Sequence, residues 1–195
     1  TMDYLCNAWG GLPRILMERG EIIQTVSDDL SYAFAPKMSV MTAEQAELEQ
    51  MKRYLENYAP CSVSDAVYFF RYTRATAKRL MEQCVSTSLG MLIWKDGVVH
   101  KHTEAAWDSK ATNAIFVLPG FDPLLVGYEK KENGMVPTEH LRDVYNLQGI
   151  IKPVILHRGQ CIATWTVRKD TIYIKPFQAD NKAACERAEK QIRNL

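Results

Sequence analysis

The sequence has no run of about 18 apolar residues among its 195, so it predicts no membrane-spanning helix. Its first residues form neither a basic segment nor an unbroken apolar stretch, and they do not look like a secretory signal peptide. No C-x-x-C pair occurs among the five cysteines, which are Cys6, Cys61, Cys84, Cys161 and Cys185. An odd, dispersed set of cysteines predicts reduced thiols and a cytoplasmic protein.

The sequence also has little net charge, +1 at pH 7, but the charge is distributed unevenly. Residues 1–65 hold 5 Lys and Arg against 10 Asp and Glu, whereas residues 66–195 hold 19 against 13. The mildly basic second part fits a polyanionic partner such as DNA. An ordinary solvated surface fits the same numbers.

Motifs of the common nucleophilic and phosphate-binding enzymes are missing. The sequence has no G-x-S-x-G elbow and no glycine-rich phosphate loop, and its cysteines and histidines lack a family spacing. It therefore predicts no catalytic residue, no metal site and no small-molecule cofactor. One carboxylate, Asp122, lies in the apolar segment GFDPLLVGY. It fits either a general base with a raised pKa or the cap of a short helix that begins at Pro123, and the cap is the preferred interpretation.

Three helices followed by a hairpin are predicted between residues 42 and 102. Thr42 with Gln45 and Ser62 with Asp65 form capping boxes for the first two helices, and Thr73 caps the third. Asp96-Gly97 is the tight turn of the hairpin. This order predicts a winged helix, in which the break between the second and third helices is the turn of a helix-turn-helix.

An incomplete copy of that unit precedes it. Pro13 lies in the first turn of a helix that Gly20 ends, and residues 21–26 and 31–35 predict a hairpin. RILMERG at 14–20 resembles KRLMEQC at 78–84, so we predict tandem winged helices with the first one truncated. The truncation exposes an apolar edge made of Tyr4, Leu5 and Trp9. An exposed apolar edge predicts that the isolated chain dimerises.

The last part of the chain changes to strand patterns. Four strands are predicted, at 114–118, 152–157, 160–167 and 171–177. A helix capped by Asp180 or Asn181 closes the chain. The predicted fold class is α+β, with a tandem winged helix followed by a small antiparallel β-barrel or sheet and a C-terminal helix. The predicted domains are residues 1–40, 41–108 and 109–195.

Basic residues crowd the third helix of the complete winged helix. In a helix-turn-helix the second helix enters the major groove through its N-terminal residues, where arginine pairs with guanine edges or phosphates. The candidate DNA contacts there are Arg71, Thr73, Arg74, Thr76, Lys78 and Arg79. A solvated helix surface, on a winged helix used for protein contacts, is the alternative.

Two further groups of candidate DNA contacts follow along the chain. The first lies on the hairpin of the complete winged helix and comprises Lys95, His100, Lys101 and His102. Its two histidines also match an H-x-H metal pair, but no third ligand has suitable spacing, so solvated histidines are preferred. The second lies in the β-rich part and comprises Lys130, Lys131, Lys152, His157, Arg158 and Arg168. Trp165 there is expected in the core rather than as a platform for stacked bases.

Several longer segments together resemble a known family. LPGFDPLLVGYEKK, GIIKPVILHRGQCIATWTV and IYIKPF occur in order after RYLENYAPCSVSDAVYFF. Through them the chain resembles the AlkZ-type winged-helix DNA glycosylases of bacteria over nearly its whole length. The resemblance implies tandem winged helices and a small β-barrel wrapped around duplex DNA. It also implies a basic residue after the G-Y pair, where Lys130 and Lys131 stand.

The resemblance further implies an activity and a catalytic motif. Such enzymes are monofunctional and use water to hydrolyse the N-glycosidic bond of alkylated bases, including bases in interstrand crosslinks. Their Gln-x-Gln or Gln-x-Asp motif lies near the N-terminus in the first winged helix, and we do not find it in this chain. Gln24 lies in IIQTV, but Val26 stands where the second polar residue is required.

This departure leaves the enzymatic role open. Either the motif lies upstream of this chain, or the chain comes from a relative that lacks it. We therefore predict that the chain itself binds duplex DNA without excising bases. A winged-helix regulator without enzymatic activity and a protein-interaction scaffold are the alternatives, although the β-rich C-terminal part fits a regulator poorly.

Overall fold

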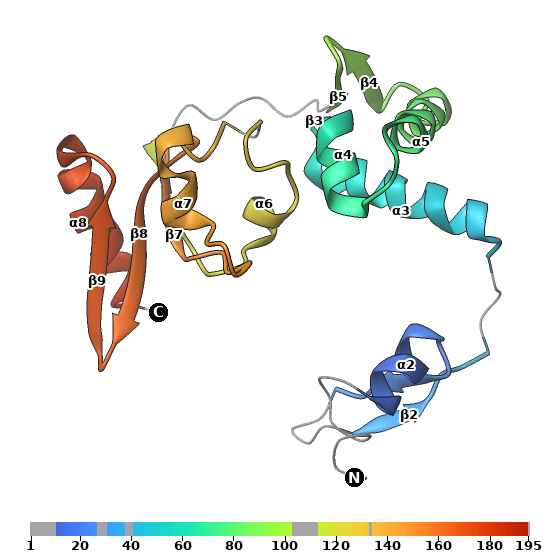
Figure 1. Cartoon of the computed structure of the whole chain (residues 1–195), viewed down its shortest axis with the longest axis horizontal. Coiled ribbons are helices and arrows are strands. Elements are labelled where there is room, and N and C mark those ends of the chain that lie inside the picture. The colour runs from blue at the N-terminus through green and yellow to red at the C-terminus, as the bar shows by residue number, and fades with distance from the viewer. Residues whose placement is uncertain (1–10, 27–30, 38–40, 103–112, 133, 195) are drawn as a thin grey trace. The chain divides into compact units, whose positions relative to one another are not determined.

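The computed structural model describes residues 11–26, 31–37, 41–102, 113–132 and 134–194, which form a mixed α+β structure with antiparallel sheets (Figure 1). The chain divides into two compact units, Thr1–Thr42 and Ala43–Leu195. Tyr4, Leu5 and Trp9, the apolar edge expected to dimerise, lie outside the described residues. Within the described ranges, no helix combines the length and the apolar character that a membrane crossing requires.

The first unit is a helix followed by a hairpin. Helix α2 (Leu12–Glu18) has its proline in the first turn, and strands β1 (Ile22–Gln24) and β2 (Tyr32–Phe34) pair in antiparallel register. The predicted helix and hairpin are therefore confirmed. None of the residues described in this unit is buried, and the side chain of Phe34 is 90% exposed. The described part of this unit thus has no hydrophobic core of its own.

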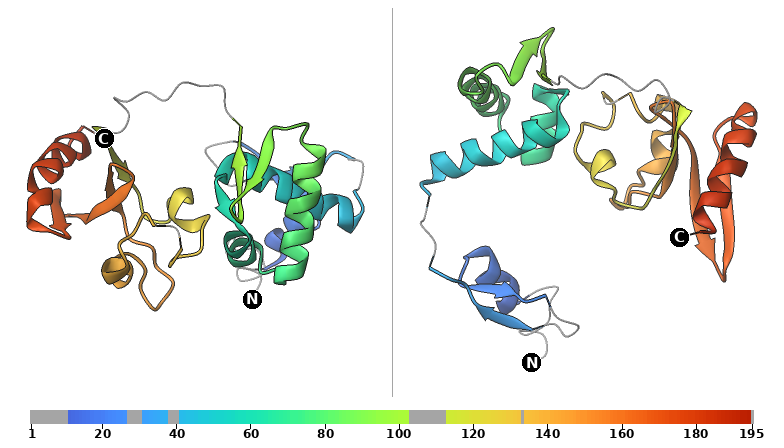
Figure 2. Two further views of the ribbon diagram at one scale, coloured as in Figure 1. Left: turned by 90° about the horizontal axis from the view of Figure 1, so that it is seen from above. Right: turned by 180° about the vertical axis from the view of Figure 1, so that it is seen from behind.

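The second unit begins with three helices, α3 (Ala43–Tyr58), α4 (Val63–Phe70) and α5 (Arg74–Thr87) (Figures 1 and 2). The apolar positions spaced by three and four residues on α3 and α5 face a common core, as their periodicity predicts. The buried residues of these two helices are Met51, Tyr54, Leu55, Ala77, Leu80, Met81 and Cys84.

The N-terminal ends of α4 and α5 have the caps that the sequence predicts. The hydroxyl of Ser62 accepts from the Asp65 backbone N–H, and the Asp65 carboxylate accepts from the Ser62 backbone N–H, which completes the capping box. The hydroxyl of Thr73 accepts from the backbone N–H of Thr76. Between the two helices Arg71 ends α4 in the left-handed conformation, at φ 61°.

A small sheet completes this helical part. Strands β4 (Leu92–Lys95) and β5 (Val98–Lys101) form the predicted hairpin, and Asp96 and Gly97 in its turn both have positive φ. A two-residue strand that the sequence did not predict, β3 (Cys61–Ser62), pairs with β5 on the side away from β4. It ties the start of α4 to the hairpin.

The β-rich part is a four-stranded antiparallel sheet in the order β6-β7-β8-β9. The four predicted strands are confirmed, as Ile115–Leu118, Val154–His157, Gln160–Arg168 and Thr171–Pro176. Helix α8 (Lys182–Ile192) packs on β6 and β9, and its Ala184 and Ala188 join a core with Ile155 of β7. Among the described residues β6 and β9 do not pair, so this part is an open sheet.

Short helices fill the segment between β6 and β7. Helix α6 (Pro123–Val126) follows Asp122 as predicted, whereas the 3-10 turn η2 (Thr138–His140) and helix α7 (Leu141–Val144) were not predicted. The side-chain cap expected for α8 at Asp180 or Asn181 is wrong. The 3-10 turn η3 (Ala179–Asn181) runs directly into α8, and Asn181 is itself helical and makes no capping bond.

Candidate nucleic-acid interface

The start of α5 presents guanidinium and ammonium groups beside two hydroxyls that are already hydrogen-bonded. The Thr73 hydroxyl caps the helix and also pairs with the Thr76 hydroxyl at 2.8 Å, so both threonines serve the backbone. Arg74 is exposed, and its Nη1 donates to the Ser64 hydroxyl at 3.3 Å. Lys78 is exposed and pairs with Glu82 at 3.7 Å. Arg79 is exposed and has no side-chain partner among the described residues.

Tyr68 brings two cations from different parts of the second unit together. The guanidinium of Arg71 lies 4.9 Å from the centroid of its ring, and the ammonium of Lys130 lies 5.8 Å from the same centroid. Lys130 also lies 4.9 Å from the ring centroid of Tyr145. All three distances are within the range of cation–π attraction. Arg71 and Arg74 line one hollow of about 440 Å³, together with Glu129 and Glu132.

Three hydrogen bonds hold the segment around Lys130 against the helical part. The Tyr54 hydroxyl donates to the carbonyl oxygen of Gly127 at 2.8 Å, and the Tyr128 hydroxyl donates to that of Tyr58 at 2.6 Å. Burial raises the pKa of Tyr128 to about 12, so its phenol stays neutral and keeps the proton that it donates.

The third bond comes from Asp65, whose side chain is buried. One of its carboxylate oxygens accepts from Ser62 in the capping box, and the other accepts from the backbone N–H of Glu129 at 2.8 Å. A buried carboxylate is costly unless both oxygens are paired. Asp65 therefore fixes both the start of α4 and the position of the segment that carries Lys130.

The conspicuous carboxylate Asp122 is a helix cap, as the preferred interpretation predicted. Its Oδ1 accepts from the backbone N–H of Leu124 at 2.9 Å, and Pro123 occupies the first helical position. Oδ1 is thus engaged in capping, which favours the helix cap over the alternative role as a general base.

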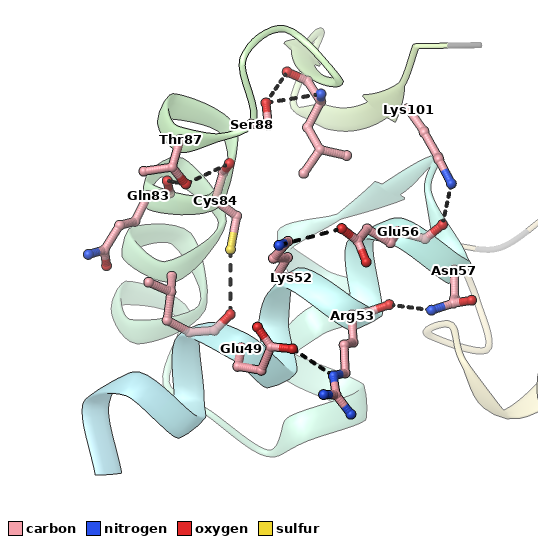
Figure 3. A network of polar contacts seen from close by, with 12 residues as sticks. Glu49, Lys52, Arg53, Glu56, Asn57, Gln83, Cys84, Thr87, Ser88 and Lys101 are labelled. Atoms are coloured by element: carbon pink, nitrogen blue, oxygen red, sulfur yellow. Dashed lines mark hydrogen bonds and ion pairs between the residues drawn. The ribbon is translucent and has the colours of Figure 1, made fainter. Parts of the chain in front are cut away.

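The predicted DNA contacts on the hairpin differ in whether their side chains are tied to another element. Lys101 donates from Nζ to the carbonyl oxygen of Glu56 at 3.1 Å, which ties the hairpin to α3 (Figure 3). Lys95, His100 and His102 are exposed. In the part of the chain that the structure describes, no three His, Cys, Asp or Glu side chains gather as metal ligands.

In the β-rich part, two predicted contacts lie at the turn between β7 and β8. The Nε of Arg158 donates to the Asn113 side-chain oxygen at 3.0 Å, and the His157 ring lies 3.4 Å from the Ala114 carbonyl oxygen. Lys131, Lys152 and Arg168 are exposed and have no side-chain partner within the described ranges.

The indole of Trp165 packs against the core formed by β7, β8 and α8, as predicted. Its Nε1 donates to the carbonyl oxygen of Leu118 at 3.0 Å. The partly buried ring is thus engaged in packing and in this hydrogen bond, which favours the expected core role over a platform for stacked bases.

Comparisons with known proteins decide the family. The family model described as DNA glycosylase AlkZ-like matches residues 8–195. The chain belongs to the AlkZ-like DNA glycosylase family.

Two relatives from Streptomyces sahachiroi are similar to this AlkZ-like chain. The interstrand DNA cross-link repair glycosylase is 20% identical over 206 residues, which cover 99% of this chain and 56% of the relative. The solved structure of DNA glycosylase AlkZ aligns with a TM-score of 0.62 at 19% identity, over 90% of this chain and 51% of that one. The AlkZ-like chain thus spans about half the length of the relatives it matches.

One tripeptide of the AlkZ-like chain matches the catalytic motif that the resemblance implies, but at an unexpected place. Gln178-Ala179-Asp180 matches Gln-x-Asp, but it lies after the last strand, in the turn before α8, instead of in the first winged helix. Gln24, the other glutamine considered, is an exposed residue of β1. Neither place corresponds to the N-terminal position that the resemblance implies.

The cations at this candidate interface were predicted from the sequence as DNA contacts, which stays a prediction, and the ring beside two of them was not predicted. Arg71, Arg74 and Lys130 come together, whereas no described contact joins them to the turn with His157 and Arg158. Tyr68, which carries two of these cations, was not predicted. A single tyrosine near the end of an aromatic helix gives no local signal for that role.

Proposed function

We propose that this chain is the DNA-binding part of a cytoplasmic DNA-repair glycosylase, which hydrolyses the N-glycosidic bond of alkylated or cross-linked bases. Membership of the AlkZ-like family supports this proposal, as does the name of the cross-link repair glycosylase that the chain resembles. The structural observation that carries it is the meeting of Arg71 and Lys130 on Tyr68, next to Arg74 at the start of α5.

The architecture we propose is a tandem winged helix. In it, α3, α4, α5 and the hairpin β4-β5 form one winged helix over residues 41–108. The helix and hairpin of residues 1–40 form the back half of another, and residues 109–195 form the β-rich domain. The element order supports this division, since each hairpin directly follows a helix. In this arrangement α5 is the helix that enters the major groove.

In the proposed mode of binding, cations contact phosphates and the hydroxyls of Thr73 and Thr76 hold the helix start. Arg74, Lys78 and Arg79 line the exposed side of α5, while Arg71 and Lys130 both lie over the ring of Tyr68. Phosphate contacts of this kind fix a protein on the duplex without reading sequence. Cleavage of the glycosidic bond needs a group that positions water, and we assign no residue of this chain to that step.

The test is fluorescence anisotropy of the chain with a labelled duplex across a series of salt concentrations. Each phosphate contact contributes about 0.9 to the slope of log affinity against log salt. We expect the double variant Arg71→Gln/Arg74→Gln to bind more weakly and to reduce that slope by about 2. The matched control is Lys182→Gln/Arg187→Gln, which removes the same charge from exposed positions of α8.

Two outcomes would contradict the proposal. Absence of binding even at low salt would remove the DNA-binding role of this chain. An equal loss in the α8 control would show that binding follows net charge rather than the proposed surface. Release of a methylated purine by this chain alone, at enzyme-like rates, would instead overturn its assignment as non-catalytic.

A further inference from the structure

An aromatic hollow in the second unit is lined by none of the predicted DNA contacts. It has a volume of about 720 Å³, which is in the usual range for small-molecule sites. Five aromatic side chains line it, namely Tyr54, Tyr58, Phe69, Phe70 and Tyr128. Four of them, Tyr54, Tyr58, Phe69 and Phe70, belong to α3 and α4, and none of the five is a cation that the proposed phosphate contacts use.

Phe69 is the ring at which the others meet. Its centroid lies 4.8 Å from that of Tyr54, 4.9 Å from that of Phe70 and 5.7 Å from that of Tyr58. A ring that served only to fill a core would be covered, but Phe69 remains 38% exposed. It therefore packs against three neighbouring rings and keeps part of its surface open to a ligand.

Polar groups of α3 border the same hollow. Gln50 lines it and makes no side-chain hydrogen bond to any described residue. Asn57 donates from Nδ2 to the carbonyl oxygen of Arg53, and Arg53 pairs with Glu49 (Figure 3). The amide of Gln50 and the Oδ1 of Asn57 thus remain able to donate to and accept from a ligand edge.

A flat ring system with donors and acceptors along its edge matches this combination. Aromatic platforms bind unstacked nucleobases through their faces, and amide side chains recognise the edges of these bases. We propose that this hollow binds a single nucleobase that is not stacked in the duplex, with Phe69 as its platform and Gln50 at its edge. The inference deepens the proposed DNA binding and rests on it.

The test compares a fully paired duplex with a duplex that contains one bulged adenine. Stacking of one base on an aromatic side chain strengthens binding by about tenfold. The chain is therefore expected to bind the bulged duplex about tenfold more tightly, and Phe69→Leu should abolish this preference while leaving affinity for the paired duplex unchanged. Gln50→Ala should weaken the preference.

The matched control is Phe116→Leu, which replaces a phenylalanine of β6 that is 50% exposed and lies outside the hollow. It should keep the preference for the bulged duplex, and both leucine variants should remain folded by circular dichroism. Equal affinity of the parent chain for the two duplexes, or a preference that survives Phe69→Leu, would overturn the proposal.

Free adenosine separates a failure of this site from a failure of DNA binding. If the chain binds no duplex, adenosine titrated into it and followed by NMR still reports on the hollow. Binding that Phe69→Leu abolishes supports the site, whereas no binding overturns it. Indole, which has an aromatic face without the edge acceptors of a base, should bind more weakly, and equal binding of indole would overturn the assignment to a nucleobase.

Discussion

The ring of Tyr58, on α3, lies directly against Gly127, which follows the short helix α6. A β-carbon at residue 127 would overlap ring carbons Cδ1 and Cε1 of Tyr58. The backbone of Gly127 has φ −71°, a value that any residue adopts, so the ring and not the backbone requires glycine here. The next residue, Tyr128, donates to the carbonyl oxygen of Tyr58 at 2.6 Å. The G-Y pair of the sequence is thus a contact between the helical and β-rich parts.

Gly127→Ala is expected to destabilise the second unit. The added methyl group forces the Tyr58 ring or α6 to move, and overpacking of this kind costs about 1–3 kcal/mol. Urea unfolding followed by circular dichroism measures the loss. Tyr58→Leu makes room for the methyl group, so Gly127→Ala should cost less in that background. An equal cost in both backgrounds would show that the ring is not the cause.

Tyr68→Leu is expected to weaken duplex binding by about fivefold, because Arg71 and Lys130 lose the ring that they contact. Each exposed cation–π contact contributes about 0.5–1 kcal/mol. Tyr68→Phe keeps that ring face and should bind as the parent chain does. Anisotropy at one fixed salt concentration measures both variants. Equal affinities of the two variants would contradict a role for the ring.

Lys175→Met is expected to destabilise the fold near neutral pH but not in acid. Asp143 Oδ1 accepts from Lys175 at 2.8 Å and Oδ2 from His140 at 2.9 Å, and these bonds, that of Lys175 foremost, hold the pKa of Asp143 below its ordinary value. A lowered carboxyl pKa stabilises the folded state above the unfolded pKa and loses this effect as pH falls through the folded pKa.

The difference between Lys175→Met and the parent chain should therefore be under about 1 kcal/mol at pH 7, as is usual for an exposed ion pair. It should shrink as the pH falls below the ordinary carboxyl pKa and disappear below the lowered pKa of Asp143. Urea unfolding at several pH values measures it, with Lys152→Met as the control at an exposed lysine without a described partner. A difference that grows in acid would contradict the assigned ion pair.

The buried cysteines are expected to react slowly with a thiol reagent in the folded chain. Burial raises the pKa of Cys61 and of Cys161 to about 12 and that of Cys84 to about 11, and it also raises the pKa of Cys185. Little thiolate, the reactive form, is then present near pH 8.

Absorbance after adding Ellman's reagent measures this reaction. The variant Cys6→Ser should show no fast phase until guanidinium chloride unfolds it, after which the remaining thiols should react together. A fast phase in the folded variant would mean that one of the four described thiols is accessible.

Sequence patterns predicted the features that depend on near neighbours. The capping box of Ser62 and Asp65 and the Asp96-Gly97 turn involve residues within three positions of each other, so their spacing is visible in the sequence. The strands and the inner faces of α3 and α5 follow from simple periodicity. Helix α7 has four residues, which is too short for a period to show.

Contacts between segments that lie far apart in the sequence could not be predicted. Asp65 also accepts from Glu129, 64 residues away, and Tyr68 meets Lys130 across a similar separation. No local pattern encodes either contact, because each depends on how the β-rich part docks on the helices. The missing cap at Asn181 has another cause, since a 3-10 turn precedes α8 and removes the extended residue that a cap needs.

Arg71 occupies a position where stability and the proposed DNA binding make opposite demands. Its left-handed backbone costs a residue other than glycine about 1–2 kcal/mol, and glycine is the usual residue at such a helix end. The chain nevertheless has an arginine there, with its guanidinium over Tyr68. Arg71→Gly should therefore melt at a higher temperature and hold DNA less tightly. This one position would then balance the thermal stability of the fold against the affinity of the chain for DNA.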